Sequence, residues 1–83
     1  MDKVLINLFV PILGESFDIF IPQNETIYKT LELIKKAIVQ ISDGKFIPSR
    51  SCSLAYKISG EILDINKSAK ESNLHNGSKL MLI

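Results

Sequence analysis

Two side chains in this sequence, His75 and Cys52, belong to the residue types that perform nucleophilic, redox or metal chemistry. His75 is the single histidine, and it stands beside an Asn-Gly pair with no cysteine next to it. Nucleophilic catalysis needs a nucleophile and a base within hydrogen-bond reach, so we expect His75 to be an exposed turn residue. Cys52 has no adjacent base, although Arg50, two residues away, could activate it slightly. We therefore expect neither residue to be catalytic.

The acidic residues and the glycines do not form a chemical motif either. No pair of acids recurs at the spacing of a carboxylate dyad or a calcium loop. Apart from Asp2, the acids are scattered at Glu15, Asp18, Glu25, Glu32, Asp43, Glu61, Asp64 and Glu71. Each of the 4 glycines falls at an expected turn, which leaves no loop to cradle a phosphate. The sequence thus predicts no metal, no cofactor and no enzymatic activity.

Length and composition indicate one small globular domain. The chain has 83 residues, of which 46% are hydrophobic and 23% are charged, and this supports a single core. A net charge of +1 without a basic cluster argues against nucleic-acid binding. The apolar runs are far shorter than the ~20 residues of a membrane span, and no signal-peptide pattern is present. With a single cysteine, these features predict a cytoplasmic protein without direct membrane insertion.

The first half of the chain predicts a hairpin followed by a helix. Residues 4–10 and 16–21 are two β-rich runs separated by Pro11 and Gly14. Asn24 or Thr26 can cap the helix that follows. The expected core-facing residues of this helix, spaced by three and four, are Ile27, Leu31, Ile34, Ile38 and Ile41. Asp43-Gly44 then supplies a left-handed C-cap.

The second half predicts a loop and three further strands. Residues 45–53 lack periodicity, whereas residues 54–58 alternate as a half-buried strand that ends at a Ser-Gly turn. A short strand at 61–63 and an anchor at Leu74 follow, and Asn76-Gly77 introduces the last strand. The predicted order is β-β-α-β-β-β, an α+β class with a mixed sheet packed on one central helix.

Two segments resemble ubiquitin-like β-grasp proteins. "PQNETIYKTLELIKKAI" resembles their capped helix, and "LAYKISGEILDINKSAKESNLHNGSKLMLI" resembles their C-terminal half. This resemblance implies a single ubiquitin-like domain over residues 1–83. Ubiquitin and the sulfur carriers end in a flexible Gly-Gly tail, whereas this sequence ends at Ile83 on an expected strand. We therefore expect a ubiquitin-like domain that is not conjugated.

The length, the absence of a tail and the "VLINLFV" to "FDIFIP" hairpin are similar to the YukD and EsaB family of bacteria. Members of that family are small cytosolic ubiquitin-like components of Gram-positive type VII secretion systems. The resemblance implies an accessory or regulatory protein, without enzymatic activity, that docks onto a membrane-embedded secretion component.

Strand alternation leaves an apolar set on the sheet face away from the helix. The residues expected to face the helix are Val4, Ile6, Leu8, Phe17, Ile19, Ile21, Leu54 or Tyr56, Ile58, Leu63, Leu80 and Leu82. The residues expected to face outward are Leu5, Asn7, Phe9, Asp18, Phe20, Ala55, Lys57, Met81 and Ile83. We predict a protein-binding face formed by Leu5, Phe9, Phe20, Lys57, Met81 and Ile83. In the ubiquitin comparison, Met81 and Ile83 fall on last-strand positions of the partner-binding patch, and Lys57 replaces its central apolar residue.

Three alternatives stay open from the sequence. A register shift of one residue or a bulge would turn some of these side chains inward, and a small monomer can also tolerate exposed apolar residues. A homodimer through the same face would produce the same pattern. The competing functions are a modifier or sulfur carrier activated at its C-terminus, and a structural β-grasp dimer or toxin-system accessory unrelated to secretion.

Overall fold

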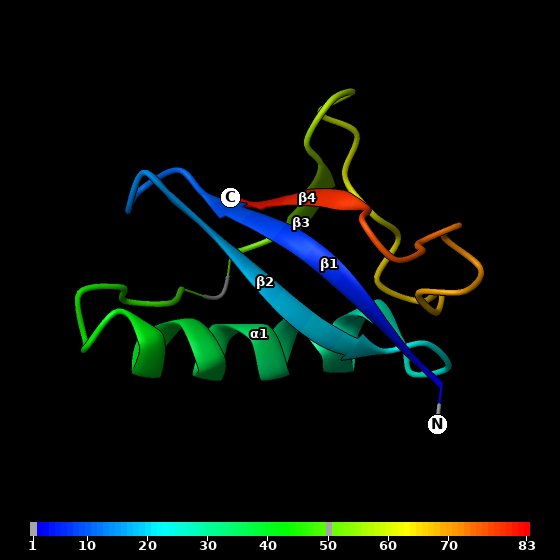
Figure 1. Ribbon diagram of the computed structural model, residues 1–83, viewed down its shortest axis with the longest axis horizontal. Helices are drawn as coiled ribbons and strands as arrows, with labels where there is room; N and C mark the ends of the chain where they lie inside the picture. Colours follow the sequence, from blue (N-terminus) through cyan, green and yellow to red (C-terminus); the bar gives the residue numbers. More distant parts are fainter. Residues whose placement is uncertain (1, 50) are drawn as a thin grey trace.

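The fold is built from one mixed sheet and one helix that crosses a single face of that sheet (Figure 1). A computed structural model describes residues 2–49 and 51–83. Its elements are β1 (Lys3–Val10), β2 (Glu15–Pro22), α1 (Ile27–Ile41), β3 (Leu54–Tyr56) and β4 (Lys79–Leu82). The strand order is β2-β1-β4-β3, so the long hairpin and the C-terminal strand lie side by side.

The hairpin of β1 and β2 has a regular register without a bulge. It runs through eight antiparallel pairs, from Lys3↔Pro22 to Val10↔Glu15. Gly14 closes the turn in the left-handed conformation, with φ 66, and its N–H donates to the Val10 carbonyl at 2.9 Å. The alternation predicted for residues 4–10 is therefore confirmed, and every second side chain of β1 is buried in the core.

The strand β4 is fixed to β1 by the Asn76-Gly77 turn that precedes it. The Leu5 N–H donates to the Asn76 side-chain oxygen at 2.8 Å, and the Gly77 N–H donates to the Leu5 carbonyl at 2.8 Å. β4 then runs parallel to β1 and antiparallel to β3. The predicted turn thus also sets the register of the closing strand.

The helix begins and ends where its caps predict. Thr26 is the N-cap, and its hydroxyl accepts a hydrogen bond from the Lys29 N–H at 3.2 Å, which decides between Thr26 and Asn24. Asp43 and Gly44 adopt positive φ values of 56 and 81 and end the helix as expected. The predicted core stripe is buried except for its last member, Ile41, on the final residue of the helix.

A threonine inside this helix presents an uncompensated polar group. Thr30 is fully buried, and its hydroxyl has no hydrogen-bond partner among the described residues. A buried unsatisfied hydroxyl costs about 1–3 kcal/mol. We expect Thr30→Val to raise the free energy of unfolding by about 1 kcal/mol in urea titrations.

The same substitution at Thr26 is the matched control for Thr30→Val. Since the Thr26 hydroxyl caps the helix, Thr26→Val should lower the free energy of unfolding by about 1 kcal/mol. A loss of stability in Thr30→Val would show that its hydroxyl makes a stabilising contact in solution.

The third strand is shorter than the alternation predicted. β3 ends at Tyr56, because the chain turns back through Gly60, whose N–H donates to the Tyr56 carbonyl at 2.8 Å. Ile58, expected in the core, lies in this turn and is 92% exposed. The short strand expected at 61–63 is reduced to an isolated bridge between Ile62 and Ala55. The strand β3 is therefore shorter than predicted, and its side-chain alternation does not reach Ile58.

The segment between this bridge and β4 is held by a capping box. The Ser68 N–H donates to a Glu71 carboxylate oxygen at 2.9 Å, and the Glu71 N–H donates to the Ser68 hydroxyl at 3.1 Å. The same segment is tied to β3 by the Tyr56 hydroxyl, which donates to the Ser72 carbonyl at 2.7 Å.

The capping box predicts a pH-dependent contribution to stability. The Ser68 backbone N–H, followed by the Ser68 hydroxyl, lowers the pKa of Glu71 below its ordinary value of 4.5. The ionised carboxylate therefore stabilises the fold above its unfolded-state pKa, and this contribution is lost as pH falls through the folded-state pKa. Glu71→Gln should slightly lower the Tm at pH 7, and the difference from wild type should vanish in strong acid. A difference that is constant with pH would contradict the capping role of the carboxylate.

Candidate functional site

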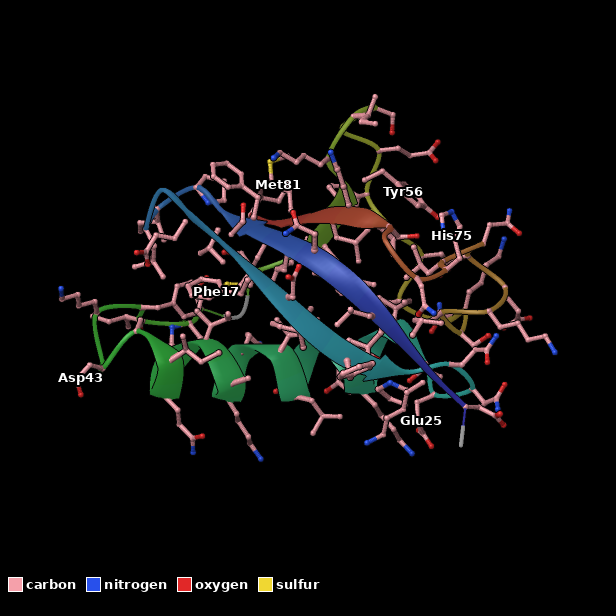
Figure 2. All side chains as sticks on the ribbon, in the orientation of Figure 1. Phe17, Glu25, Asp43, Tyr56, His75 and Met81 are labelled. Atoms are coloured by element: carbon pink, nitrogen blue, oxygen red, sulfur yellow. The ribbon has the colours of Figure 1, made fainter. Side chains whose placement is uncertain are left out.

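The sheet face away from α1 carries the predicted protein-binding residues. Strand register places Leu5 beside Phe20 and Phe9 beside Met81, so these four side chains lie on one face. Figure 2 shows Met81 on the side of the sheet away from α1, whereas Phe17 lies on the helix side. Within the described residues no register shift turns this set inward.

At one end of this face, Phe9, Met81 and Lys57 form a group that we call the Phe9 cluster. The Lys57 ammonium lies 4.7 Å from the centroid of the Phe9 ring, a cation–π contact. The Lys57 N–H donates to the Lys79 carbonyl at 3.1 Å, which continues the sheet alternation one residue beyond β3. Lys57 therefore joins Phe9 and Met81 on the outer face, and the cluster offers both apolar and cationic surface.

The other end of the face is the cross-strand pair of Leu5 and Phe20, and the Phe20 side chain is 65% exposed. A polar pair separates it from the Phe9 cluster, since the Asn7 amide donates to an Asp18 carboxylate oxygen at 3.2 Å. Leu5 and Phe9 are four residues apart on β1, a separation of about 13 Å. The outer face therefore consists of two apolar clusters with the hydrogen-bonded pair of Asn7 and Asp18 between them. A partner that covers both clusters must also satisfy this polar pair.

Two residues predicted on this face have surroundings that differ from the expectation. Ala55 pairs with Met81 and bridges to Ile62, and these neighbours bury it completely, although we predicted it to face outward into solvent. Ile83 is half-exposed, but it lies at the far end of β4, where its N–H donates to the Ser53 carbonyl at 2.9 Å. Ile83 is therefore peripheral to the two clusters.

An apolar hollow at this end of the sheet was missed by the sequence analysis. Its lining includes Pro11, Ile12, Phe46, Ile47, Cys52, Leu82 and Ile83. Ile12 and Ile47 are 79% and 82% exposed. The available signal was the presence of isoleucine in segments whose Pro and Gly residues predict turns. These side chains extend the apolar surface from Ile83 toward the hairpin tip.

His75 and Cys52, the residues of reactive types, lie outside the two clusters of the outer face, and their hydrogen bonds are structural. His75 is exposed, as predicted, and its backbone N–H donates to the Ser78 hydroxyl at 2.9 Å within the turn before β4. Cys52 is partly buried, and its sulfur accepts from the Ser49 N–H at 3.5 Å. Arg50, the cation proposed to influence Cys52, lies outside the described residues. Residues 2–49 and 51–83 hold no group of three or more side chains suited to a metal ion.

The strand order and the single helix define the class of fold. A mixed sheet of order β2-β1-β4-β3, with a parallel central pair and one helix across it, is the ubiquitin-like β-grasp fold. The predicted fold class is thus confirmed. No protein-family model matches the sequence, and no curated protein matches it. Its helix, within the described part of the chain, is too short and too polar to cross a membrane.

Solved structures similar to this chain include domains of type VII secretion proteins. The ubiquitin-like domain of EccD5 from Mycobacterium xenopi has a TM-score of 0.84 at 12% identity, covering 100% of this chain and 94% of that one. The ubiquitin-like domain of Mycobacterium tuberculosis EccD1 has a TM-score of 0.81 at 14% identity, covering 100% and 99%. A chain of the MycP5-free ESX-5 inner membrane complex matches with a TM-score of 0.74 at 12% identity, covering 100% of this chain and 21% of that chain.

Proposed function

We propose that this chain is a cytoplasmic protein-interaction module that serves as an accessory or regulatory component of a type VII secretion system, similar in role to YukD and EsaB. The observation that carries the proposal is the full-length similarity to EccD ubiquitin-like domains, with TM-scores of 0.84 and 0.81. A further similar chain comes from an inner membrane complex, which supports a membrane-embedded secretion component as the partner.

The outer sheet face supplies the contacts in this proposal. Exposed aromatic and aliphatic side chains that become desolvated give most of the binding energy in protein interfaces. Phe20 and Leu5 provide one such anchor, and Phe9 with Met81 provides the second. Lys57 gives the second anchor a positive charge that selects for an acidic or aromatic group on the partner.

We further propose that the domain acts by binding and performs no reaction of its own. The two side chains of reactive types support this view. The His75 ring nitrogen Nδ1 lies 3.1 Å from the Asn76 carbonyl oxygen in a turn, and the Cys52 sulfur accepts a hydrogen bond from the Ser49 N–H in a loop. An adenylation assay with an activating enzyme distinguishes this role from that of a modifier or sulfur carrier. Formation of an adenylate or thioester would replace the proposal with the modifier role.

Co-purification tests the secretion role. The tagged chain, expressed in its own host, should retain a membrane-embedded secretion component after detergent extraction of the membrane. A tagged β-grasp domain without the Phe9 cluster serves as the control for non-specific capture. Recovery of no secretion component would refute the proposed role, and a stable dimer in light scattering would favour a structural dimer instead.

A further inference from the structure

The strand β2 forms a free edge of the sheet with backbone groups directed into solvent. The Gln23 N–H donates to the Asp2 carbonyl at 2.8 Å, which shows that this residue points its backbone toward β1. The direction of the backbone N–H and C=O groups alternates from residue to residue along an antiparallel strand. These groups of Ser16, Asp18 and Phe20 therefore point away from β1. All three residues are exposed, so three N–H and three C=O groups line the free edge of β2.

The partners of these residues on β1 confirm this alternation. Leu5 and Asn7 lie opposite Phe20 and Asp18 in the register. Both use their backbone groups on the β4 side, where the Gly77 N–H donates to the Leu5 carbonyl and the Asn7 N–H donates to the Ser78 carbonyl, each at 2.8 Å.

The edge lacks most of the features that usually protect such strands. Edge strands are commonly blunted by lysines, prolines, bulges or short length. β2 is eight residues long, is paired with β1 without a bulge and carries its one proline at the last position. Asp18 is the one charged side chain within the interior of the strand.

A half-exposed apolar surface lies between this edge and α1. Phe17 and Ile19 face the helix side but are only partly buried, whereas their β1 partners Leu8 and Ile6 are fully buried. Figure 2 shows Phe17 between β2 and α1. The apolar layer between the sheet and α1 is therefore partly exposed to solvent along β2.

The helix contributes Ala37 and Ile41 to this opening, and Leu33, which also lines a hollow with Tyr28 and Lys29 on the solvent side of the helix, lies at its outer rim. Residues spaced by four lie in one row along a helix, which aligns Leu33, Ala37 and Ile41. Leu33 and Ile41 are 54% and 53% exposed. Val39, about 200° around the helix from Ala37, lines a hollow with Pro48. Since the chain after Pro48 leads to β3 at the opposite edge, the row with Ala37 lies on the β2 flank of α1.

The edge could pair with a second copy of this chain or with a segment of another protein, and charge distinguishes between these two occupants. β2 contains Glu15 and Asp18 and no lysine or arginine. In a two-fold antiparallel pairing of two copies, Asp18 would face itself or an uncharged β2 residue, and never a cation. Like charges directly opposite each other destabilise a strand pair, whereas opposite charges stabilise it. The edge therefore favours a cationic segment from another chain.

We propose that the free edge of β2 binds an extended segment of a partner protein by strand addition, with apolar residues toward α1 and a lysine or arginine beside Asp18. The main-chain groups of Ser16, Asp18 and Phe20 supply the hydrogen bonds. The half-exposed row on α1, together with Phe17 and Ile19, receives the alternate apolar side chains. This inference is independent of the secretion role, because it uses the main chain of β2 and the Asp18 carboxylate and does not depend on apolar contacts of the two outer-face clusters.

Two matched peptides test the chemistry of the edge. The probes are acetyl-Val-Lys-Val-Lys-Val-Lys-Val-amide and the same peptide with Glu in place of Lys, titrated into the ¹⁵N-labelled chain by NMR. We expect the amide signals of Ser16, Asp18 and Phe20 to shift, and the Lys peptide to bind about three- to ten-fold more tightly. The net charge of the chain is +1, so overall attraction does not favour the cationic probe. Equal affinities, or shifts that spare β2, would overturn the proposal.

A charge reversal provides the second arm of this test. Asp18→Lys should invert the preference, so that the Glu peptide binds more tightly. Glu61→Lys is the matched control, because Glu61 is exposed in the turn after β3, at the far edge of the sheet. A similar inversion in Glu61→Lys would show a general charge effect and overturn the role of Asp18.

Proline substitutions test strand addition itself. Asp18→Pro removes an N–H that the sheet does not use, so the domain should fold and lose at least about ten-fold in peptide affinity relative to Asp18→Asn. Ile19→Pro removes an N–H directed at β1 and should reduce thermal stability strongly. Equal binding by Asp18→Pro and Asp18→Asn, or a concentration-dependent dimer that Asp18→Pro disrupts, would overturn the proposal.

Discussion

Leu80→Ala should lower the free energy of unfolding by about 2–5 kcal/mol. Leu80 lies in β4 between Leu8 of β1 and Tyr56 of β3, and its side chain is 0% exposed. Truncation to alanine loses the transfer free energy of the removed methyl groups and leaves a cavity that the paired strands cannot close. A chain of this length has a total stability of roughly 4–12 kcal/mol. Urea denaturation at 25 °C should therefore show a much lower midpoint.

The next residue along β4 is the control for this prediction. Met81 has the same flanking strands but faces the outer side of the sheet, so Met81→Ala should cost less than about 1 kcal/mol. An equal loss in both variants would show that the two sheet faces are buried alike. The alternation on which the outer face depends would then be wrong.

The parts of the fold that follow local rules were predictable from the sequence. The turn at Gly14, the cap at Thr26 and the Asn76-Gly77 turn each depend on a few neighbouring residues, and the structure places all three as expected. The alternation of β1 was equally clear, because a strand in the centre of the sheet must bury every second side chain. Local signals therefore determined the fold class and every element except the short strand expected at 61–63, which is an isolated bridge.

The errors have two causes, a turn that begins earlier than expected and a contact between residues distant in the sequence. Ile58 continued an alternating pattern, but the turn closed by Gly60 ends the ladder two residues earlier. Phe46 lies in an aperiodic segment, yet it is buried, and its N–H donates to the Ser42 hydroxyl at 3.0 Å. No periodic pattern marks a single anchor of this kind. Its burial depends on the space that α1 and the sheet leave open.

The sequence predicted which side chains lie on the outer face, but it did not predict the hydrogen bond between them. Strand alternation assigned Leu5, Phe9, Phe20 and Met81 to one face, and the register agrees. The hydrogen bond between Asn7 and Asp18 that divides the face depends on the pairing of two strands, which the sequence leaves open. The free edge of β2 likewise became visible only with the strand order.

Phe9→Asp and Met81→Asp should each weaken binding to the co-purifying secretion component by at least about 30-fold. These side chains are neighbours across β1 and β4, and the proposed interface buries both. A carboxylate at either position would have to be desolvated in the interface, and it would attract the Lys57 ammonium that the partner is proposed to contact. Phe9→Asp also removes the ring under the Lys57 ammonium, so it should have the larger effect. Surface plasmon resonance with the immobilised partner gives the affinities.

Two further variants separate a binding defect from a folding defect. Ile58→Asp introduces the same charge at a side chain that is 92% exposed in the turn after β3, and it should bind as wild type. Phe20→Asp alters the most exposed aromatic residue of the face, so it should retain a cooperative circular-dichroism melt while losing affinity. If Phe9→Asp and Met81→Asp melt cooperatively and still bind, the partner uses another surface. Selective loss of binding with retained melting would assign the outer sheet face to the partner, because folding and recognition would then depend on opposite sides of the same strands.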